Sequence, residues 1–548
     1  MDKIRQRLSN LVVGAGLAIV ILLAPAILRA QATGTMTGYV KDASGALVPQ
    51  AKVTATHVQH GTSYPAETNG EGFYNFPALD PGEYTLTVEK EGFERSVQTG
   101  LTLSVGQNLR VDATLVVGTM TQEVSVTGQA PLVDTTSGTV SGLVDDRRIV
   151  DLPLNGRNVM SLAELVPGVV SVYAPESLSS ARGGPMMNSN GGRQNMNLYT
   201  FDGSFYNNPS RNTGMNFPPP DAIQEFRLLT SNFDAEFGRN SGSQAMVVAR
   251  AGTNALHGDV WEFVRNDDFN ARNFFAPIVP TIKENQFGGA VGGPIRKDKA
   301  YFFGSYQDLR NRPQGVANQT LVPSAAERGG DFTDLLNPQD PTKSIILSNP
   351  VNPNTGAPFT TPGGAPCVAN NIIDPSCITT PSQNFLKYVP QSPSGRVVSL
   401  GSSPVNDAMY LGRIDLNLSS KQSIFGHVFV DHNYGSTAFP CCGGSNIAGY
   451  DSAITPAETD SIALNDTYTF RPNLVNQVVL AFLRTSSTYH DTRTDVPTSE
   501  GINMPQYSPN GATGIAVSGS FNLQGNGFNL FKNNNFQVRD TLTWVHGR

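Results

Sequence analysis

The most constraining feature of this 548-residue chain is a set of eight strand-like stretches in its second half. Most of them are close to the about 9–11 residues that a tilted β-strand needs to cross a bilayer. Aromatic residues recur along them. The eight stretches cover residues 256–265, 286–293, 299–308, 408–418, 421–432, 460–470, 474–485 and 536–546.

The connections between these stretches alternate between long and short. In chain order they hold 20, 5, 99, 2, 27, 3 and 50 residues. An up-and-down outer-membrane barrel has short turns on one rim and long loops on the other, so it produces this alternation, whereas a soluble sandwich does not. The sequence therefore predicts that residues 256–548 form part of an antiparallel transmembrane β-barrel with long external loops.

Within the stretch 408–418, the side chains alternate in polarity. One face carries Tyr410, Ile414, Leu416 and Leu418, and the other carries Arg413, Asp415 and Asn417. This pattern predicts an apolar face toward lipid and a polar face toward a hydrated lumen. The composition agrees with a mainly β chain, because only 15% of residues are charged while Gly (54) and Pro (37) are abundant. The net charge of −7 argues against a nucleic-acid-binding protein.

The N-terminus has the features of an export signal. Lys3, Arg5 and Arg7 precede an apolar run, and Ala30-Gln31-Ala32 offers a small-residue cleavage site. A membrane anchor is the alternative, because the apolar run approaches the about 20 residues that span a bilayer. Pro25 interrupts the run, so we expect residues 1–32 to be a signal peptide and the chain to be exported.

Residues 33–117 alternate short strand patterns with turn signals, which predicts a small antiparallel β-sandwich of seven strands. The segment resembles the carboxypeptidase regulatory-like module, whose fold is transthyretin-like and carbohydrate-binding-like. The resemblance rests on these stretches: Gly38-x-Val40, Pro49-x-Ala51-x-Val53, Gly72-x-Tyr74-x-Phe76 and Leu79-x-Pro81-Gly82-x-Tyr84. Carbohydrate binding is one function that the resemblance implies.

No catalytic constellation accompanies this module. A zinc peptidase needs His and Glu ligands at fixed spacing on a helix, and the chain has no HExxH. His57 and His60 lie in a strand-and-turn segment without a Glu between them, so we interpret them as two surface histidines. We therefore expect no enzyme activity, no catalytic residue, no cofactor and no metal site.

Residues 118–255 carry a second set of motifs, of which residues 152–158 and 221–258 are the most specific. Their order resembles the α+β plug of TonB-dependent outer-membrane receptors, specifically the Oar-like group with an N-terminal regulatory-like domain. The resemblance implies that external loops capture a ligand, that the plug blocks the lumen, and that a TonB-type energy-transducing protein pulls on the N-terminal segment.

In that family, residues 122–128 correspond to a TonB-box-like segment. The candidate partner-binding residues are Glu123, Val124, Ser125, Val126 and Thr127. This short β-branched stretch could be a strand offered to the partner by β-augmentation, in which backbone hydrogen bonds supply the affinity. It could equally be the last strand of the sandwich or the first strand of the plug.

The long predicted loops contain the four cysteines. Residues 311–405 hold 14 of the 37 prolines, together with Cys367 and Cys377, which could form a disulfide in an oxidising compartment. Cys441 and Cys442 are adjacent in the next long loop. We assign them no chemistry, because adjacent cysteines seldom pair with each other.

Eight strands are fewer than the about 22 of a plugged outer-membrane transporter. We therefore expect an N-terminal fragment that forms an open, curved sheet. The implied function is transport of an unidentified ligand, with a slight preference for glycans, across the outer membrane of a Gram-negative-type bacterium. Outer-membrane lipid, the TonB-type protein and the ligand are the expected partners, and the N-terminal domain is expected in the periplasm. A surface adhesion or structural protein without transport is the alternative.

Overall fold

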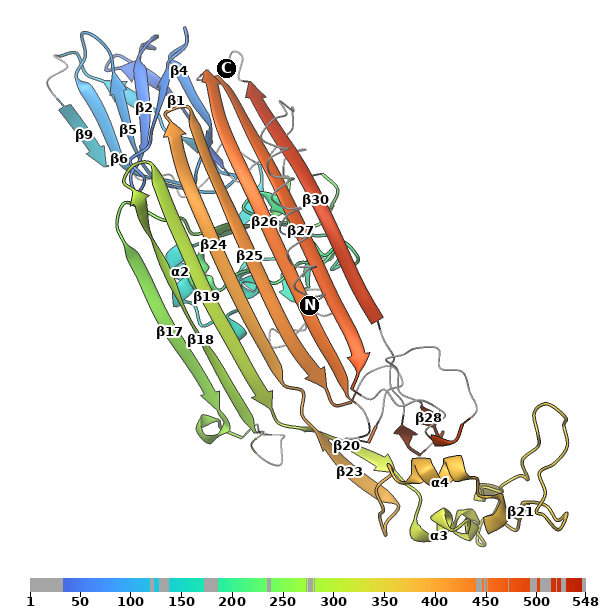
Figure 1. The fold of residues 1–548 in the computed structure, drawn as a ribbon. Coiled ribbons are helices and arrows are strands. Elements are labelled where there is room, and N and C mark those ends of the chain that lie inside the picture. Colours follow the sequence, from blue (N-terminus) through green and yellow to red (C-terminus); the bar gives the residue numbers. More distant parts are fainter. Residues whose placement is uncertain are drawn as a thin grey trace, which may run out of the picture.

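In a computed structural model of the chain, the strands are grouped into a small N-terminal domain, a central domain and a large sheet (Figure 1). The predicted signal peptide and the Cys441–Cys442 pair lie outside the described residues. The structure describes residues 33–118, 123–127, 138–171, 186–233, 238–272, 274, 279, 281–439, 446–447, 450, 452–471, 473–492, 500–502, 514–518, 520–523 and 529–544.

The N-terminal domain is a sandwich of two sheets. One sheet has the order β4-β1-β7 with β8 also paired to β1, and the other has the order β3-β2-β5-β6-β9. The strands are β1 (Gly34–Asp42), β2 (Lys52–His57), β3 (Ser63–Glu67), β4 (Phe73–Leu79), β5 (Gly82–Glu89), β6 (Arg95–Leu103), β7 (Asn108–Arg110), β8 (Ala113–Leu115) and β9 (Glu123–Thr127).

The period-two pattern places every second side chain of a strand in the core of this sandwich. In β5, Tyr84, Leu86 and Val88 are fully buried, whereas the side chains between them are not. The prediction of a purely antiparallel sandwich is wrong, because β1 pairs in parallel with β7 and β8, and β6 pairs in parallel with β9. These pairings join segments separated by long stretches of chain, which local turn signals do not reveal.

The central domain contains a five-stranded mixed sheet with the order β10-β15-β16-β13-β14. Short helical segments α2 (Asp146–Asp151), η1 (Asn155–Arg157) and η2 (Val159–Leu165) follow its first strand. Its strands are β10 (Val140–Asp145), β13 (Leu198–Phe201), β14 (Ser204–Phe205), β15 (Ile223–Ser231) and β16 (Gln244–Ala249), and a separate pair is formed by β11 (Val169–Ser171) and β12 (Met187–Ser189).

The large sheet has eight antiparallel strands, so the predicted fold class and all eight predicted wall strands are confirmed. Within the described residues, β17 and β30 each have one neighbour, and the sheet does not close. The strands are β17 (His257–Asn266), β18 (Ile282–Arg296), β19 (Ala300–Pro313), β24 (Val405–Ser419), β25 (Gln422–Thr437), β26 (Ala453–Arg471), β27 (Leu474–Asp491) and β30 (Asn529–Trp544).

The strands of this wall are joined alternately by long and short connections, as predicted. The short ones are residues 297–299, 420–421 and 472–473, and the long ones are 267–281, 314–404, 438–452 and 492–528. The N-terminal domain lies at the end of the wall with the short connections, and the long connections lie at the opposite end (Figure 1). The two ends of the wall therefore differ in the length of their connections, as the two rims of an outer-membrane barrel do.

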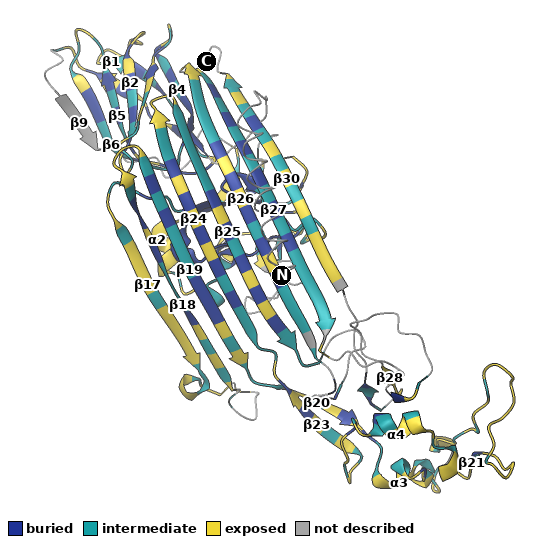
Figure 2. Ribbon diagram, viewed as in Figure 1, coloured by how far each residue is buried: buried dark blue, intermediate teal, exposed yellow. Residues whose placement is uncertain are grey.

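The two faces of the wall also differ as predicted (Figure 2). Along β24, the predicted lipid-facing residues Tyr410, Ile414 and Leu418 are about half exposed, whereas Arg413 and Asp415 are buried. The buried face lies against the central domain, because one core cluster combines Phe201 and Phe226 of that domain with Phe429 of the wall. The central domain therefore occupies the concave side of the sheet, where a plug is expected.

Described parts of three long connections, 314–404, 438–452 and 492–528, form a small lobe around buried residues that include Phe385 and Tyr450. Cys367 and Cys377 are joined in this lobe by a disulfide with a Cα–Cα distance of 5.8 Å. No helix in the described part of the chain is long and apolar enough to cross a membrane. The lobe contains β20 (Val316–Leu321), α3 (Ala325–Arg328), β21 (Val368–Ala369), β22 (Ile372–Ile373), α4 (Thr380–Leu386), β23 (Arg396–Gly401), β28 (Ile515–Ala516) and β29 (Asn522–Leu523).

Candidate functional site

The tightest link between plug and wall is the hairpin formed by β13 and β14. Its two-residue turn, Asp202-Gly203, has positive φ angles of 47° and 77°. Turns with positive φ at both central residues match the twist of a hairpin, and Asp-Gly is a preferred sequence for them. The turn carries the Asp202 carboxylate into the plug–wall interface, where the residue is fully buried.

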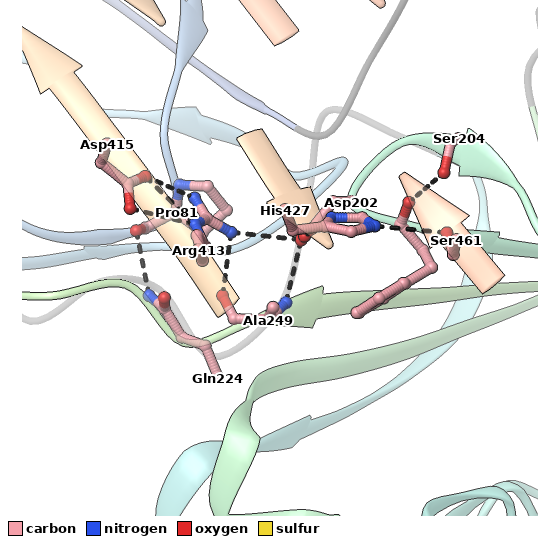
Figure 3. A network of polar contacts seen from close by, with 10 residues as sticks. Pro81, Asp202, Ser204, Gln224, Ala249, Arg413, Asp415, His427 and Ser461 are labelled. Atoms are coloured by element: carbon pink, nitrogen blue, oxygen red, sulfur yellow. Dashed lines mark hydrogen bonds and ion pairs between the residues drawn. The ribbon is translucent and has the colours of Figure 1, made fainter. Parts of the chain in front are cut away.

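Asp202 is bound from both sides of the interface (Figure 3). Arg413 of β24 donates to Oδ1 at 3.2 Å, the Nδ1 of His427 of β25 lies 2.6 Å from Oδ2, and the backbone N–H of Ala249 donates to Oδ1 at 2.9 Å. Arg413 also donates to Asp415 at 2.8 Å and to the carbonyl of Ala249 at 3.1 Å. One plug carboxylate therefore joins two neighbouring wall strands.

These contacts keep Asp202 ionised although it is buried. Burial raises the pKa of Asp202, but the charge of Arg413 and the hydrogen bond from His427 lower it by more, so the pKa lies below its usual range. The other ring nitrogen of His427 lies 3.3 Å from the Ser461 hydroxyl.

Further contacts hold the rest of the hairpin. Gln537 of β30 accepts from the Phe205 N–H at 2.7 Å and donates to the Phe205 carbonyl at 2.8 Å, and Arg539 donates to the Gly203 carbonyl at 2.8 Å. We call this unit the polar latch; it consists of plug residues 201–205 and wall residues Arg413, His427, Gln537 and Arg539. Water can replace the partners of its charged and amide groups on release, and the ring of Phe201 packs beside them against His427 and Phe429.

A second link joins the two motifs on which the plug resemblance is strongest. Arg157 of η1 forms a buried ion pair with Asp221 and donates to Gln307 of the wall at 3.3 Å. Its guanidinium also lies over the rings of Trp261 and Phe263, at 5.3 and 4.4 Å from their centroids. The two motifs are therefore halves of one contact with the first and third wall strands.

Arg157→Lys is expected to destabilise the plug by about 1–3 kcal/mol, because lysine cannot keep a planar fork on Asp221 and Gln307 while stacking on two rings. Urea unfolding of the detergent-solubilised protein, followed by tryptophan fluorescence, measures the change because Trp261 lies beside the guanidinium. Arg147→Lys is the matched control, since Arg147 is 88% exposed. Equal urea midpoints for the two variants would contradict the assignment.

The N-terminal domain is packed against the wall through His60, and His57 lies behind it. The interpretation of His57 and His60 as surface residues is wrong: His57 is 2% exposed and His60 is partly buried. The ring of His60 stacks between His57 and Tyr301 of β19, with centroid distances of 4.3 and 4.9 Å. The Tyr301 hydroxyl donates to the carbonyl of His60 at 2.6 Å. His60 is therefore covered by the wall, whereas His57 is covered by its own domain, through Pro81 and Tyr84.

The same domain binds the plug through the turn between β6 and β7. The Val105 N–H donates to Glu225 at 2.9 Å, and Arg227 donates to the Val105 carbonyl at 2.6 Å. Gln224 donates to the Pro81 carbonyl at 3.2 Å, as Figure 3 shows. All of these plug residues belong to β15, so the N-terminal domain is bound to an interior strand of the plug sheet.

Burial at this junction shifts four pKa values. Desolvation lowers the pKa of His57 to about 4 and, helped by the nearby charges of His57 and Arg413, that of His60 to about 3. Desolvation also raises the pKa of Asp80 to about 6 and that of Glu225 to about 7. The shifts favour the neutral form of each group, as expected for groups removed from water.

The candidate partner-binding residues 123–127 are not part of the latch. They form β9, which pairs in parallel with β6 from Arg95↔Glu123 to Thr99↔Thr127. Of the alternatives that the sequence left open, the structure places this stretch as the last strand of the sandwich. Cys367 and Cys377 lie in the lobe at the opposite end of the wall, so the structure does not bring the two predicted sites together.

A cavity of about 180 Å³ lies between the plug and the wall, near the ends of β26, β27 and β30 that lead to the long connections. Nine of its twelve lining residues are of polar type: Asn208, Ser210, Arg211, Glu458, Thr459, Thr485, Ser486, Ser487 and Asn533; the others are Met215, Ala457 and Phe531. The described residues contain no group of three or more His, Cys, Asp or Glu that could hold a metal ion.

Sequence reasoning missed Asp202, His427 and Gln537 as functional residues. The signal for Asp202 was the Asp-Gly pair between two strand patterns, which predicts a tight turn but no partner. Arg413 and Asp415 were predicted to face the lumen, and they do. Their role depends on the plug carboxylate that they meet, which lies 211 residues away from Arg413 along the chain.

An antiparallel wall with one apolar and one polar face, occupied on its polar side by a folded domain, defines a plugged outer-membrane β-barrel protein. Comparison with known families agrees. Residues 248–548 match the outer membrane beta barrel domain, and residues 35–116 match the carboxypeptidase regulatory-like domain. The chain belongs to the outer membrane beta barrel domain family, and the predicted resemblance is confirmed.

The TonB-dependent transporter Oar of Myxococcus xanthus is 30% identical over 301 residues, which are 52% of this chain and 27% of that protein. The chain thus spans about a quarter of that relative. Among solved structures, the outer membrane transporter YddB of Escherichia coli is 10% identical, with a TM-score of 0.44 over 74% of this chain and 45% of that one. The ferric enterobactin receptor PfeA of Pseudomonas aeruginosa is also 10% identical, with a TM-score of 0.39 over 73% and 45%.

Proposed function

We propose that this chain acts as a TonB-dependent outer-membrane transporter. In this proposal the wall spans the outer membrane, the plug occludes the lumen, and a TonB-type protein in the periplasm supplies the work that releases the plug. The polar latch is the observation that carries the proposal. A domain held on the lumen face by exchangeable polar contacts is suited to reversible release, whereas a barrel filled by its own side chains is not.

The compartments follow from the two ends of the wall. Long loops of outer-membrane barrels face outward and short turns face the periplasm. The N-terminal domain lies beside the short turns at 297–299 and 420–421, since Tyr301, close to the first turn, donates to the carbonyl of His60, and Asn417, close to the second, donates to Thr62. We therefore place this domain and β9 in the periplasm, and the disulfide-bonded lobe outside the cell.

The 180 Å³ cavity on the external side of the plug is our candidate ligand site. Its amide and hydroxyl groups, with Arg211 and Glu458 as charged partners, match a hydroxyl-rich or peptide-like ligand better than an apolar one. Its position between plug and wall would allow a bound ligand to contact both. Glycans stay a candidate class, together with peptides and siderophores.

Uptake measurements test the proposal. Cells carrying the wild-type gene, or the same gene without residues 123–127, are compared for uptake of radiolabelled ferric siderophores, labelled oligosaccharides and labelled peptides. We expect one probe to accumulate only with the wild type, while both proteins reach the outer membrane. Uptake that is indifferent to the deletion, with loss of surface attachment instead, would favour an adhesion protein.

A substitution on the outer face tests the membrane placement. Ile414→Lys places a charge near the middle of β24, where we expect a cost of about 2–4 kcal/mol for folding into lipid vesicles. Leu418→Lys, close to the short-connection rim on the same face, is expected to cost only about 0–1 kcal/mol. Similar costs at both positions would contradict a bilayer around this wall.

A further inference from the structure

The N-terminal domain is bound to the lumen face of the wall across several strands. Three wall side chains donate hydrogen bonds to the domain: Tyr301 to the carbonyl of His60 at 2.6 Å, Asn417 to the hydroxyl of Thr62 at 2.5 Å, and Gln477 to the hydroxyl of Thr33 at 3.2 Å. These side chains come from β19, β24 and β27, which are the first, second and fifth of five neighbouring strands in the sheet. The domain therefore lies across the short-connection end of the concave side that holds the plug (Figure 1).

The same domain is inserted into the plug. The turn between β6 and β7 places Val105 in a small buried apolar cluster with three plug residues, Leu229, Met246 and Val248. Glu225 accepts a hydrogen bond from the N–H of Val105 at 2.9 Å, and Arg227 donates to its carbonyl at 2.6 Å. Both charged side chains are buried. Apolar burial and hydrogen bonds to charged groups both contribute to this contact, so it is the stronger attachment of the domain.

The attachment to the wall is weaker by the same criteria. Its three hydrogen bonds join neutral groups, and the net gain from such a bond is small because water replaces the lost partner. The ring of His60 adds a stack on Tyr301. The charge of Arg413 attracts Asp80 of the domain, but Arg413 is already bound to two other carboxylates. We therefore expect the domain to separate from the wall before it separates from the plug.

We propose that the N-terminal domain is a clasp that retains the plug: the plug leaves the lumen face only together with this domain, after the domain has separated from the wall. The plug is then held twice, directly by the polar latch on β24, β25 and β30, and indirectly by the clasp on β19, β24 and β27. The consequence for transport rests on the proposed function, since release of the latch alone would not open a passage. Retention of the plug is a property of the fold and is measured without a ligand or a partner.

A covalent tether between the domain and the wall tests the clasp. Thr62→Cys with Asn417→Cys places two thiols at one of the domain–wall hydrogen bonds, and a short bismaleimide joins them. The control tether, Thr54→Cys with Thr87→Cys, joins register partners on β2 and β5 within the domain. Both proteins carry Cys441→Ser and Cys442→Ser, so that the reagent meets no other free thiol.

The measurement is hydrogen exchange of the plug hairpin β13–β14 in the detergent-solubilised protein, at a urea concentration below the unfolding transition. We expect the domain–wall tether to slow exchange of the hairpin amides by about tenfold or more, and the control tether to change it by less than about threefold. Exchange that the domain–wall tether leaves unchanged overturns the proposal, because the plug would then open while the domain stays on the wall.

Weakening the wall contact is the converse measurement. Tyr301→Phe with Asn417→Ala removes two of the domain–wall hydrogen bonds and leaves the plug contact in place. We expect the hairpin amides to exchange about tenfold faster, while the Val105 amide stays as protected as β15 because the domain and the plug remain joined. Tyr306→Phe, on the same strand beside Tyr410 of the outer face, is the control.

Two results of this second measurement would overturn the proposal. Exchange at Val105 that is faster than in the hairpin would show that the domain leaves the plug first. Hairpin exchange equal to that of Tyr306→Phe would show that the wall contacts do not retain the plug. Since neither readout depends on uptake, both results leave the transport function to be decided by the uptake comparison alone.

Discussion

Asp202→Ala is expected to destabilise the plug by about 3–5 kcal/mol, because it leaves Arg413 and His427 buried beside an empty space. Removing one member of a buried ion pair costs more than the pair contributes, since the remaining charge loses its partner without regaining water. Arg413 would still hold Asp415, at 2.8 Å, so the wall itself is expected to stay folded. The loss should therefore appear in the plug and not in the barrel strands.

Urea unfolding and hydrogen exchange of the detergent-solubilised protein measure this effect. Exchange is expected to increase in β13, β14 and β16, while the amides of β24 and β25 keep their protection. Glu164→Ala is the matched control, because it removes one plug carboxylate that is exposed. A destabilisation below about 1 kcal/mol for Asp202→Ala would show that the latch does not hold the plug.

A double-mutant cycle with Arg413→Ala isolates the pair. If the two side chains act as one link, the double variant is expected to lose little more than Asp202→Ala alone, giving a coupling energy of about 1–3 kcal/mol. Additive losses would mean that Arg413 stabilises the protein through its bonds to Asp415 and the Ala249 carbonyl. Asp202 would then be held by His427 and by the backbone.

The wall could be predicted from the sequence because its signal is local. Each strand alternates between lipid and lumen with a period of two, and each connection ends at a turn, so strand number and order can be read along the chain. Most predicted stretches are shorter than the strands; β26, for example, covers Ala453–Arg471 rather than 460–470. Strands that continue beyond the membrane into the loops lose the apolar half of the pattern, so the sequence does not mark their ends.

The contacts that hold the plug and the N-terminal domain could not be predicted, because they join distant parts of the chain. His60 contacts Gly252, 192 residues away, and Tyr301, 241 residues away. A polar residue in a turn is most often solvated, so local sequence favours a surface position for it. The parallel pairing of β9 with β6 is equally hidden, since parallel neighbours need no connecting turn.

The second large expected effect is a dependence of the unfolding free energy on pH, and it arises from the two histidines at this junction. As the pH falls below about 6.5, the unfolded chain binds protons at His57 and His60, while the folded protein resists protonation down to about pH 4 and 3. Stability contributed by these two groups is therefore present at neutral pH and lost on acidification. Between pH 7 and 5 the loss amounts to about 2 kcal/mol for each histidine.

Asp80 and Glu225 act in the opposite direction. Their folded pKa values, about 6 and about 7, lie above those of the unfolded chain, so the folded protein binds protons first as the pH falls. The stability that they contribute is fully present in acid and is lost as the pH rises. Between pH 7 and 5 the two carboxyls together regain about 3 kcal/mol. The wild-type protein is therefore expected to change little in stability over this interval.

Replacing both histidines removes one side of this balance. We expect His57→Gln with His60→Gln to gain about 3 kcal/mol in unfolding free energy between pH 7 and 5, and Asp80→Asn with Glu225→Gln to lose about 4 kcal/mol. Urea midpoints at a series of pH values measure these slopes, and the wild type is the reference. A slope is informative even where the substitutions weaken packing, because lost ring contacts lower the stability equally at every pH. If both double variants followed the wild-type profile, the four groups would not be titrating at a buried junction, and the N-terminal domain would not be fixed on the wall and plug as described.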